Sequence, residues 1–261
     1  MLKIIRASLY KLFKDRPFKI TLIIGAALAV IFSLAYKFII PELGTGYYAL
    51  MTSSSPTNNF GLAIPINLVI FIIGEFNYGT IRNKIIAGNR RINIYISLLI
   101  MGLIYSLSMM AVYMGVSVGL STILGGFYPE GVVADAKTIV SIIGATIMVY
   151  MTLTALAVLA ASGIRNMGAA ITVTVVGIMM AYIAGFIFNI AQSLDFSNET
   201  IEYPVAIQLL DPLFFHSVVS LSTFGLGDAT NLLGLNIVSN AIYSAIFIAG
   251  GIVAFQYSDV K

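Results

Sequence analysis

The sequence contains no cysteine, a single histidine and few charged residues. Only 10% of its 261 residues are charged, and His216 is the one histidine. Without cysteine the chain has neither a disulfide framework nor thiolate chemistry, and one histidine cannot build a histidine-based metal cluster within one chain. We therefore expect no metal in this chain, and since the apolar composition leaves no room for a catalytic domain we also expect no catalytic residue and no cofactor.

Apolar residues dominate instead. They make up 59% of the chain, whereas a soluble domain has about 45–50% apolar and about 25% charged residues. The charged residues gather between apolar runs rather than along them, which leaves little length for a soluble catalytic domain. The sequence predicts one all-α, polytopic transmembrane domain over residues 1–261.

Six apolar runs are expected to cross the bilayer, since about 20 helical residues span about 30 Å of hydrocarbon. The third run exceeds that length and must tilt, kink or protrude. The six predicted spans are residues 20–40, 60–76, 94–124, 138–162, 169–191 and 235–255.

Residues 1–18 precede the first span and carry both apolar and basic residues. Leu2, Ile5, Leu9 and Leu12 recur at helical spacing among lysines and arginines, and Pro17 ends the pattern. This pattern predicts an amphipathic interfacial helix whose basic face meets anionic lipid. A positively charged anchor with no other role is the alternative.

Lysine and arginine are distributed asymmetrically between the predicted connections. Twelve fall on one side of the membrane, and only Lys37 and Lys137 fall on the other. Because such residues mark the cytoplasmic side, both termini are expected in the cytoplasm. The twelve are Lys3, Arg6, Lys11, Lys14, Arg16, Lys19, Arg82, Lys84, Arg90, Arg91, Arg165 and Lys261.

Residues 192–234, between the fifth and sixth spans, include an apolar patch that contains Asp211 and Pro212. An aspartate near the bilayer centre costs about 2.5–3.5 kcal/mol, and the following proline breaks the helical hydrogen-bond ladder. The segment is therefore predicted to form external, re-entrant helices rather than a span.

A polar, mostly basic segment separates the second and third spans. Residues 74–93 begin GEFNYGTIRNKIIAGNRR and form the largest internal cytoplasmic feature. Glu75 stands at the end of the second span. A charge within a span can mark a proton pathway, but beside this basic segment a structural ion pair is the favoured interpretation of Glu75.

Two further sequence patterns bear on function. GVVADAKT at 131–138 nearly matches a phosphate-binding loop, but Ala136 replaces the glycine that lets the backbone approach a phosphate, so ATP binding in this chain is rejected. The asparagines within or beside the spans are the candidates for lining a transport pathway: Asn67, Asn189, Asn236 and Asn240.

The run EFNYGTIRNKIIAGNRRINIYISLLI, residues 75–100, closely resembles the segment after the second span in permease subunits of the type 2 ABC exporters. The six spans, the basic N-terminal helix and the long segment before the last span are also similar to that family. The resemblance implies that residues 74–93 form a coupling segment and residues 1–18 a connecting helix. The residues that it assigns to coupling with an ATPase are Glu75, Gly79, Thr80, Arg82, Lys84, Arg90, Arg91 and Arg165.

The same resemblance implies the partners. Two copies of the permease would pair with two copies of a separate ABC ATPase subunit, which holds ATP and Mg²⁺, in the cell membrane of a bacterium. Membrane lipid is a further partner, and nucleic acid is not expected. The weakly charged spans suit an amphipathic or apolar cargo, with peptides and peptide antibiotics favoured.

Two other function classes stay open at this point. A non-transporting scaffold or anchor would use the basic segment only to recruit a partner, and its asparagines would be scattered rather than gathered in one cavity. A secondary carrier would have inverted repeats and a midplane charge, and the sequence displays neither.

Overall fold

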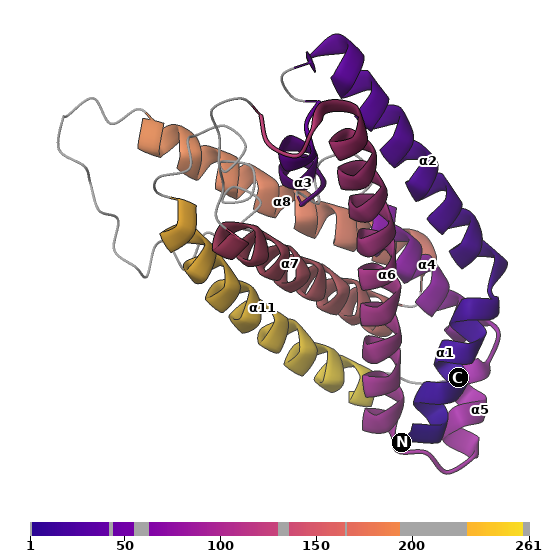
Figure 1. Ribbon diagram of the computed structural model, residues 1–261. Coiled ribbons are helices and arrows are strands. Elements are labelled where there is room, and N and C mark those ends of the chain that lie inside the picture. Colours follow the sequence, from indigo (N-terminus) through magenta and orange to yellow (C-terminus); the bar gives the residue numbers. More distant parts are fainter. Residues whose placement is uncertain are drawn as a thin grey trace.

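The computed structural model describes residues 2–41, 44–54, 63–129, 136–164, 166–193 and 229–257, with backbone only for 2–3, 181–193 and 229–236. Every regular element within these ranges is helical, which confirms the all-α class (Figure 1). The helices are α1 Leu2–Lys14, α2 Arg16–Ile39, α3 Gly46–Ser54, α4 Ala63–Asn77, α5 Thr80–Ile86, α6 Arg91–Gly125, α7 Ala136–Gly163, α8 Met167–Ser193 and α11 Ala229–Tyr257.

Four helices are long and apolar enough to cross a membrane: α2, α6, α7 and the part of α11 from Ile237 to Tyr257. Helices α4 and α5 form a bent pair with an angle of 54° and could make a fifth span. The first fourteen residues of α8, Met167–Met180, form a shorter apolar helix. The chain thus has the helices of a polytopic membrane protein, while the full number of six spans stays a prediction.

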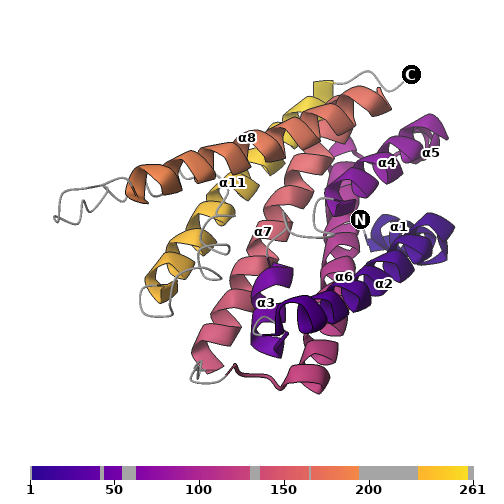
Figure 2. The same ribbon diagram turned by 90° about the horizontal axis from the view of Figure 1, so that it is seen from above.

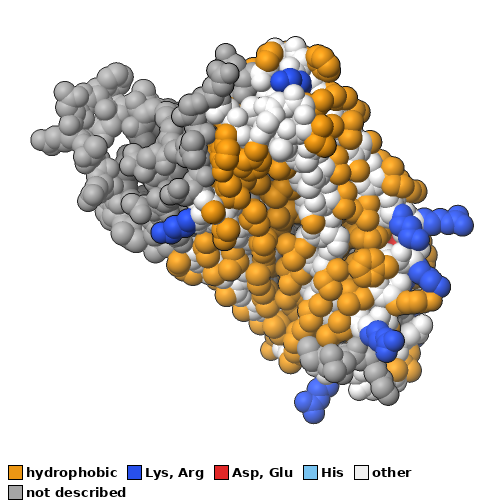
Figure 3. Space-filling view, in the orientation of Figure 1, with side chains coloured by type: hydrophobic (Ala, Val, Ile, Leu, Met, Phe, Trp, Pro, Cys, Tyr) orange, Lys and Arg blue, Asp and Glu red, His pale blue; other side chains and the backbone are white. Residues whose placement is uncertain are grey.

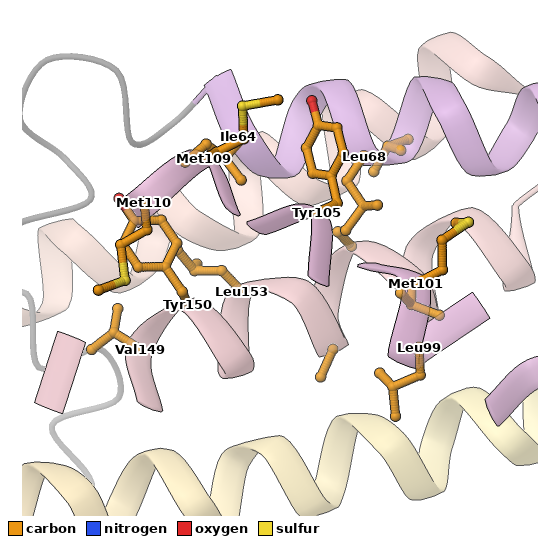
Figure 4. Packing of buried hydrophobic residues seen from close by; sticks show 14 of the residues in the cluster. Ile64, Leu68, Leu99, Met101, Tyr105, Met109, Met110, Val149, Tyr150 and Leu153 are labelled. Carbon is orange, nitrogen blue, oxygen red and sulfur yellow. The ribbon is translucent and has the colours of Figure 1, made fainter. Parts of the chain in front are cut away.

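Helix α6 stands at the centre of the packing. It contacts α2 and α3 on one side and α7 on another, and α7 in turn packs along α11 (Figures 1 and 2). The buried core lies where α4, α6 and α7 meet, with Leu68 of α4, Tyr105 of α6 and Leu153 of α7 pointing into it (Figure 4). Helices that are apolar on most faces can bury several sides at once, which explains why one helix contacts so many others.

Helix α3 lies between the first two predicted spans, where the sequence pattern predicts no helix. Its Tyr47, Leu50 and Met51 are buried, and it packs mainly against α6. The backbone N–H of Tyr47 donates to the carbonyl of Phe127 at 2.8 Å. Ser54 is also buried, but its hydroxyl donates to the Leu50 carbonyl at 2.6 Å, which removes the cost of burying it.

The predicted external segment 192–234 is described only at its ends. Residues 192–193 close α8 and residues 229–234 open α11, six residues before the predicted start of the last span. The re-entrant helices predicted between them fall in residues 194–228, outside the described part of the chain.

Basic side chains gather at one end of the molecule. Most lysine and arginine side chains on the face in Figure 3 lie toward the end formed by α1 and α5, and apolar side chains cover most of the remainder. We call residues 6–19 and 75–91 the charged end. Helix α1 is confirmed as a helix there, and its residues Ile4, Ser8 and Leu12 form a buried face while Arg6 and Lys14 are exposed.

Candidate functional site

The candidate site at the charged end begins where α4 stops. Gly79 follows α4 with φ of +68°, a left-handed conformation that glycine adopts without steric cost. No atom lies within 4 Å of where a Cβ would stand on Gly79, so the backbone angle rather than crowding requires glycine. The resulting 54° bend turns α5 away from the axis of α4.

Glu75 ties three helices together. Its side chain, in the last turns of α4, is almost completely buried at 3% exposure. One carboxylate oxygen pairs with the ammonium of Lys11 from α1, and the other lies 3.4 Å from the ammonium of Lys84 from α5. Lys84 also donates to the Ser8 hydroxyl of α1 at 3.2 Å. The expected pairing of Glu75 with the basic segment is confirmed, and its second partner, Lys11, was not anticipated.

The opposite face of α5 is exposed. Ile81 anchors the helix in the core, whereas Arg82 and Ile86 point outward, with Ile86 72% exposed. Tyr78, just before α5, is 83% exposed. Tyr78 in the turn before α5, together with Arg82 and Ile86 on α5, presents one cation and two large apolar side chains beside the Glu75 ion pairs, and tyrosine and arginine are enriched at protein interfaces. We call Tyr78, Arg82 and Ile86 the α5 face.

The remaining predicted coupling residues occupy different environments. Thr80 is half-buried at the start of α5, and Arg90 is exposed. Arg91 lies at the start of α6, and its guanidinium donates to the Gln256 carbonyl in α11 at 2.7 Å. Arg165 lies outside the described residues. The predicted coupling residues therefore fall into two kinds. Some, such as Lys84 and Arg91, bond to other helices of the chain. Others, such as Arg82 and Arg90, are exposed.

An aromatic group behind this site joins α4, α6 and α11. Tyr95 of α6 and Phe255 of α11 are fully buried, with ring centroids 6.0 Å apart, and Phe76 of α4 lies 6.0 Å from Phe255. Tyr95 packs directly on the backbone of Gly251. Phe76 follows Glu75, so the end of α4 contacts both the ion-pair cluster and the last helix.

The predicted pathway asparagines are described at two positions. Asn67 is half-buried, and its amide donates to the Ala63 carbonyl at 2.9 Å. Asn240 is fully buried between α7 and α11, where the Thr152 hydroxyl lies 2.9 Å from its side-chain oxygen and 2.9 Å from the Ser244 hydroxyl. The side chains of Asn189 and Asn236 are outside the described part. A shared cavity for all four stays a prediction.

The Thr152 cluster is expected to stabilise the contact between α7 and α11. Because hydrogen bonds between membrane helices contribute on average about 0.6 kcal/mol and at most about 1.7 kcal/mol, Thr152→Val should lower the free energy of unfolding in mixed micelles by about 1 kcal/mol. Thr172→Val is the matched control, since Thr172 is exposed and its hydroxyl bonds only within α8, to Gly168. Equal stability of the two variants would show that the cluster does not hold the helices together.

The site offers no evident ligands for a metal ion. Among the described residues, no group of three or more histidine, cysteine, aspartate or glutamate side chains could hold one. What the arrangement can do is mechanical: a displacement of α5 would reach α1 and α4 through the two ion pairs of Glu75.

Comparisons with known proteins do not assign the chain to a family. No protein-family model matches it, and a search of curated proteins finds no match. The resemblance of residues 75–100 to exporter permeases therefore stays a prediction from the sequence.

Proposed function

We propose that this chain is the membrane-spanning subunit of an ABC exporter that couples ATP hydrolysis by a separate ATPase subunit to movement of its own helices. The observation that carries the proposal is the α5 face, which projects from the charged end and is backed by the Glu75 ion pairs. This arrangement would transmit a push on α5 to α1 and α4.

Exposed apolar groups at the charged end support a protein partner rather than lipid alone. Tyr78 and Ile86 stand on either side of the α4–α5 bend, beside the exposed Arg82. Tyrosine and arginine are enriched at the energetic centres of protein interfaces.

Orientation, cargo and assembly follow the same proposal. The charged end would face the cytoplasm of a bacterial cell with both termini on that side, in keeping with the excess of lysine and arginine there. Two permease copies would enclose the pathway, and two ATPase copies would bind ATP and Mg²⁺. The weakly charged helices favour an amphipathic or apolar cargo such as a peptide. The chain itself would not be an enzyme.

The proposal is tested by purifying the tagged chain in mild detergent from cells that naturally produce it. We expect an ATPase that carries the phosphate-binding pattern G-x-x-x-x-G-K-[ST] to co-purify. After reconstitution of the two proteins in lipid vesicles, ATP hydrolysis should rise severalfold over that of the ATPase alone, and an apolar peptide should raise it further.

Capture of the ATPase without a change in its hydrolysis rate would contradict the coupling role. The control is the same ATPase with empty vesicles of equal lipid content, which separates an effect of lipid from an effect of the chain. If the ATPase hydrolyses ATP at the same rate with the chain in the vesicles as with empty vesicles, a scaffold or anchor is favoured.

A further inference from the structure

A cavity of 250 Å³ lies at the charged end, between the junction of α1 with α2 and the face of α4. Its walls also include Tyr105 of α6 and Met167 of α8. Ile70 lines it and is 39% exposed, so the cavity reaches the apolar surface of the bundle. Pockets for drug-sized ligands measure about 300–1,000 Å³, so this smaller cavity suits a head group with the beginning of a chain.

The lining changes from charged to apolar along α4. Glu75, Phe71 and Asn67 are spaced by four residues and share one helix face, and all three line the cavity. Eight residues of helix correspond to about 12 Å. The charged groups Lys11, Asp15 and Glu75 stand near the charged end, while Phe71 and Ile70 lie farther along α4 toward Asn67. Charged groups thus stand at one end of the cavity and apolar groups in its middle, with the amide of Asn67 beyond them, and the exposed Ile70 offers an apolar chain a side exit.

The charges in and beside the lining nearly balance, and the carboxylate of Asp15 is the group that a cationic head would meet. Lys11 and Glu75 pair with each other and Lys84 adds a second cation to Glu75, whereas Asp15 belongs to neither ion pair. Burial raises the pKa of Asp15; Glu75 acts in the same direction and Lys11 opposes it. A cation in the cavity would stabilise the ionised carboxylate, because an opposite charge nearby favours the charged form.

Aromatic rings in the cavity also favour a cationic head group. Phe18 and Tyr105 are buried with ring centroids 5.4 Å apart, and both line the cavity together with Phe71. Ammonium groups are attracted to the faces of such rings, by about 0.5–1 kcal/mol at exposed sites and about 2 kcal/mol when desolvated.

We infer that this cavity binds the ammonium head of an amphiphile next to Asp15, with the apolar chain leaving past Ile70 into the membrane. The shared chemistry is a primary ammonium on an apolar chain, whether it belongs to a lipid head group or to a single-chain amine. The inference does not rest on the proposed exporter function, because binding is measured on this chain alone.

The test uses tryptophan fluorescence, since the sequence contains no tryptophan. Phe71→Trp places a reporter in the cavity, and Ile23→Trp places one on an exposed site of α2 that does not line it. The full-length chain in neutral maltoside micelles is titrated with a brominated single-chain amine or with the brominated fatty acid of equal length. Brominated phosphatidylethanolamine and phosphatidylglycerol form the second, lipid arm.

We expect the amine to quench the cavity reporter, the tryptophan of Phe71→Trp, at a concentration about tenfold lower than the acid, since a hydrogen bond to a charged group contributes about 1.5–3 kcal/mol. Adding Asp15→Asn should abolish this difference, and adding Asp15→Glu should retain it. Asparagine keeps the size of the Asp15 side chain, and its amide oxygen can accept the backbone hydrogen bond from Arg16 as the carboxylate does, so the asparagine variant should fold. The surface reporter, the tryptophan of Ile23→Trp, should be quenched equally by the amine and the acid.

If phosphatidylethanolamine quenches the cavity reporter at a lower concentration than phosphatidylglycerol, the bound ammonium belongs to a lipid head group. If only the single-chain amine is preferred over its acid, the ligand is a free amphiphile. Equal quenching of the cavity reporter by cationic and anionic probes in both arms would overturn the inference. A preference that survives in Asp15→Asn would overturn it as well.

Discussion

Glu75→Gln is expected to lower the free energy of unfolding by about 2–4 kcal/mol, the largest loss that we predict for a single substitution. Removing one partner of a buried ion pair typically costs about 3–5 kcal/mol because the other charge stays unpaired. The side chain of Lys84 is only 16% exposed and would be left in that position, whereas Lys11, at 47% exposure, regains water. The measurement is denaturant unfolding in mixed micelles.

A double variant tests the physical reason. Lys84→Met in the Glu75→Gln background removes the unpaired ammonium, so the double variant should be less destabilised than the sum of the two single changes by about 1 kcal/mol or more. Lys14→Gln is the control, because Lys14 is exposed on α1 and belongs to neither ion pair. Strict additivity, or a loss in Lys14→Gln equal to that in Glu75→Gln, would contradict the cluster as an anchor.

Gly251→Ala is expected to be the second most disruptive change. A Cβ at this position would stand 1.9 Å from the Tyr95 hydroxyl oxygen and 2.6 Å from the ring carbon that bears it. Tyr95 is fully buried, so α6 and α11 would have to separate. Overpacking costs about 1–3 kcal/mol, which should appear as a lower thermal unfolding temperature in detergent.

The neighbouring glycine supplies a matched control. At Gly250 the nearest atom to an added Cβ is a Leu159 methyl carbon at 3.9 Å, which is ordinary van der Waals contact. Gly250→Ala should therefore be neutral or slightly stabilising, because alanine is favoured over glycine in helices by about 1 kcal/mol. If both alanine variants melt at the same temperature, the packing of Tyr95 on Gly251 is not a constraint.

Local sequence patterns predicted much of the helical content. Each of the six predicted spans coincides with an observed helix, because long apolar runs bounded by polar residues leave few alternatives. The amphipathic pattern likewise predicted α1, but the predicted range 1–18 was too long: α1 ends at Lys14, and Pro17 stands in the first turn of α2, where its missing N–H costs nothing. Helix α3 was missed because its serines and tyrosines resemble a loop, and a hydroxyl that bonds to its own helix leaves no sequence signal of burial.

Contacts between distant segments were harder to predict. Glu75 and Lys84 are nine residues apart, so their pairing followed from local charge, whereas Lys11 is 64 residues from Glu75. The spacing of residues in the sequence does not show that Lys11 of α1 faces α4. The same holds for the contact of Tyr95 with Gly251, which depends on the relative register of α6 and α11.

The predicted site residues illustrate the same limit. A charge-rich segment indicates a surface but does not show which of its charged side chains are exposed. Lys84 is partly buried against Glu75, whereas Arg82, two residues away, is exposed. Asn240 contacts Thr152 between α7 and α11, whereas Asn67 lines the cavity at the charged end. Residue type alone gave both asparagines the same predicted role.

A single charge reversal on the α5 face tests its coupling role. The measurement is the rate of ATP hydrolysis by the co-purified ATPase, reconstituted with the wild-type chain, with Arg82→Glu or with Lys14→Glu. Arg82 and Lys14 are both exposed at the charged end, and both substitutions change the charge equally, but only Arg82 belongs to the α5 face. Both variants should retain the wild-type melting temperature.

An arginine at the centre of an interface is worth about 2 kcal/mol or more. We therefore expect Arg82→Glu to lower the hydrolysis stimulated by the chain about tenfold at limiting ATPase concentration, while Lys14→Glu retains it. Full stimulation by Arg82→Glu at normal abundance in the vesicles would contradict the account and leave residues 74–93 with a topological role alone.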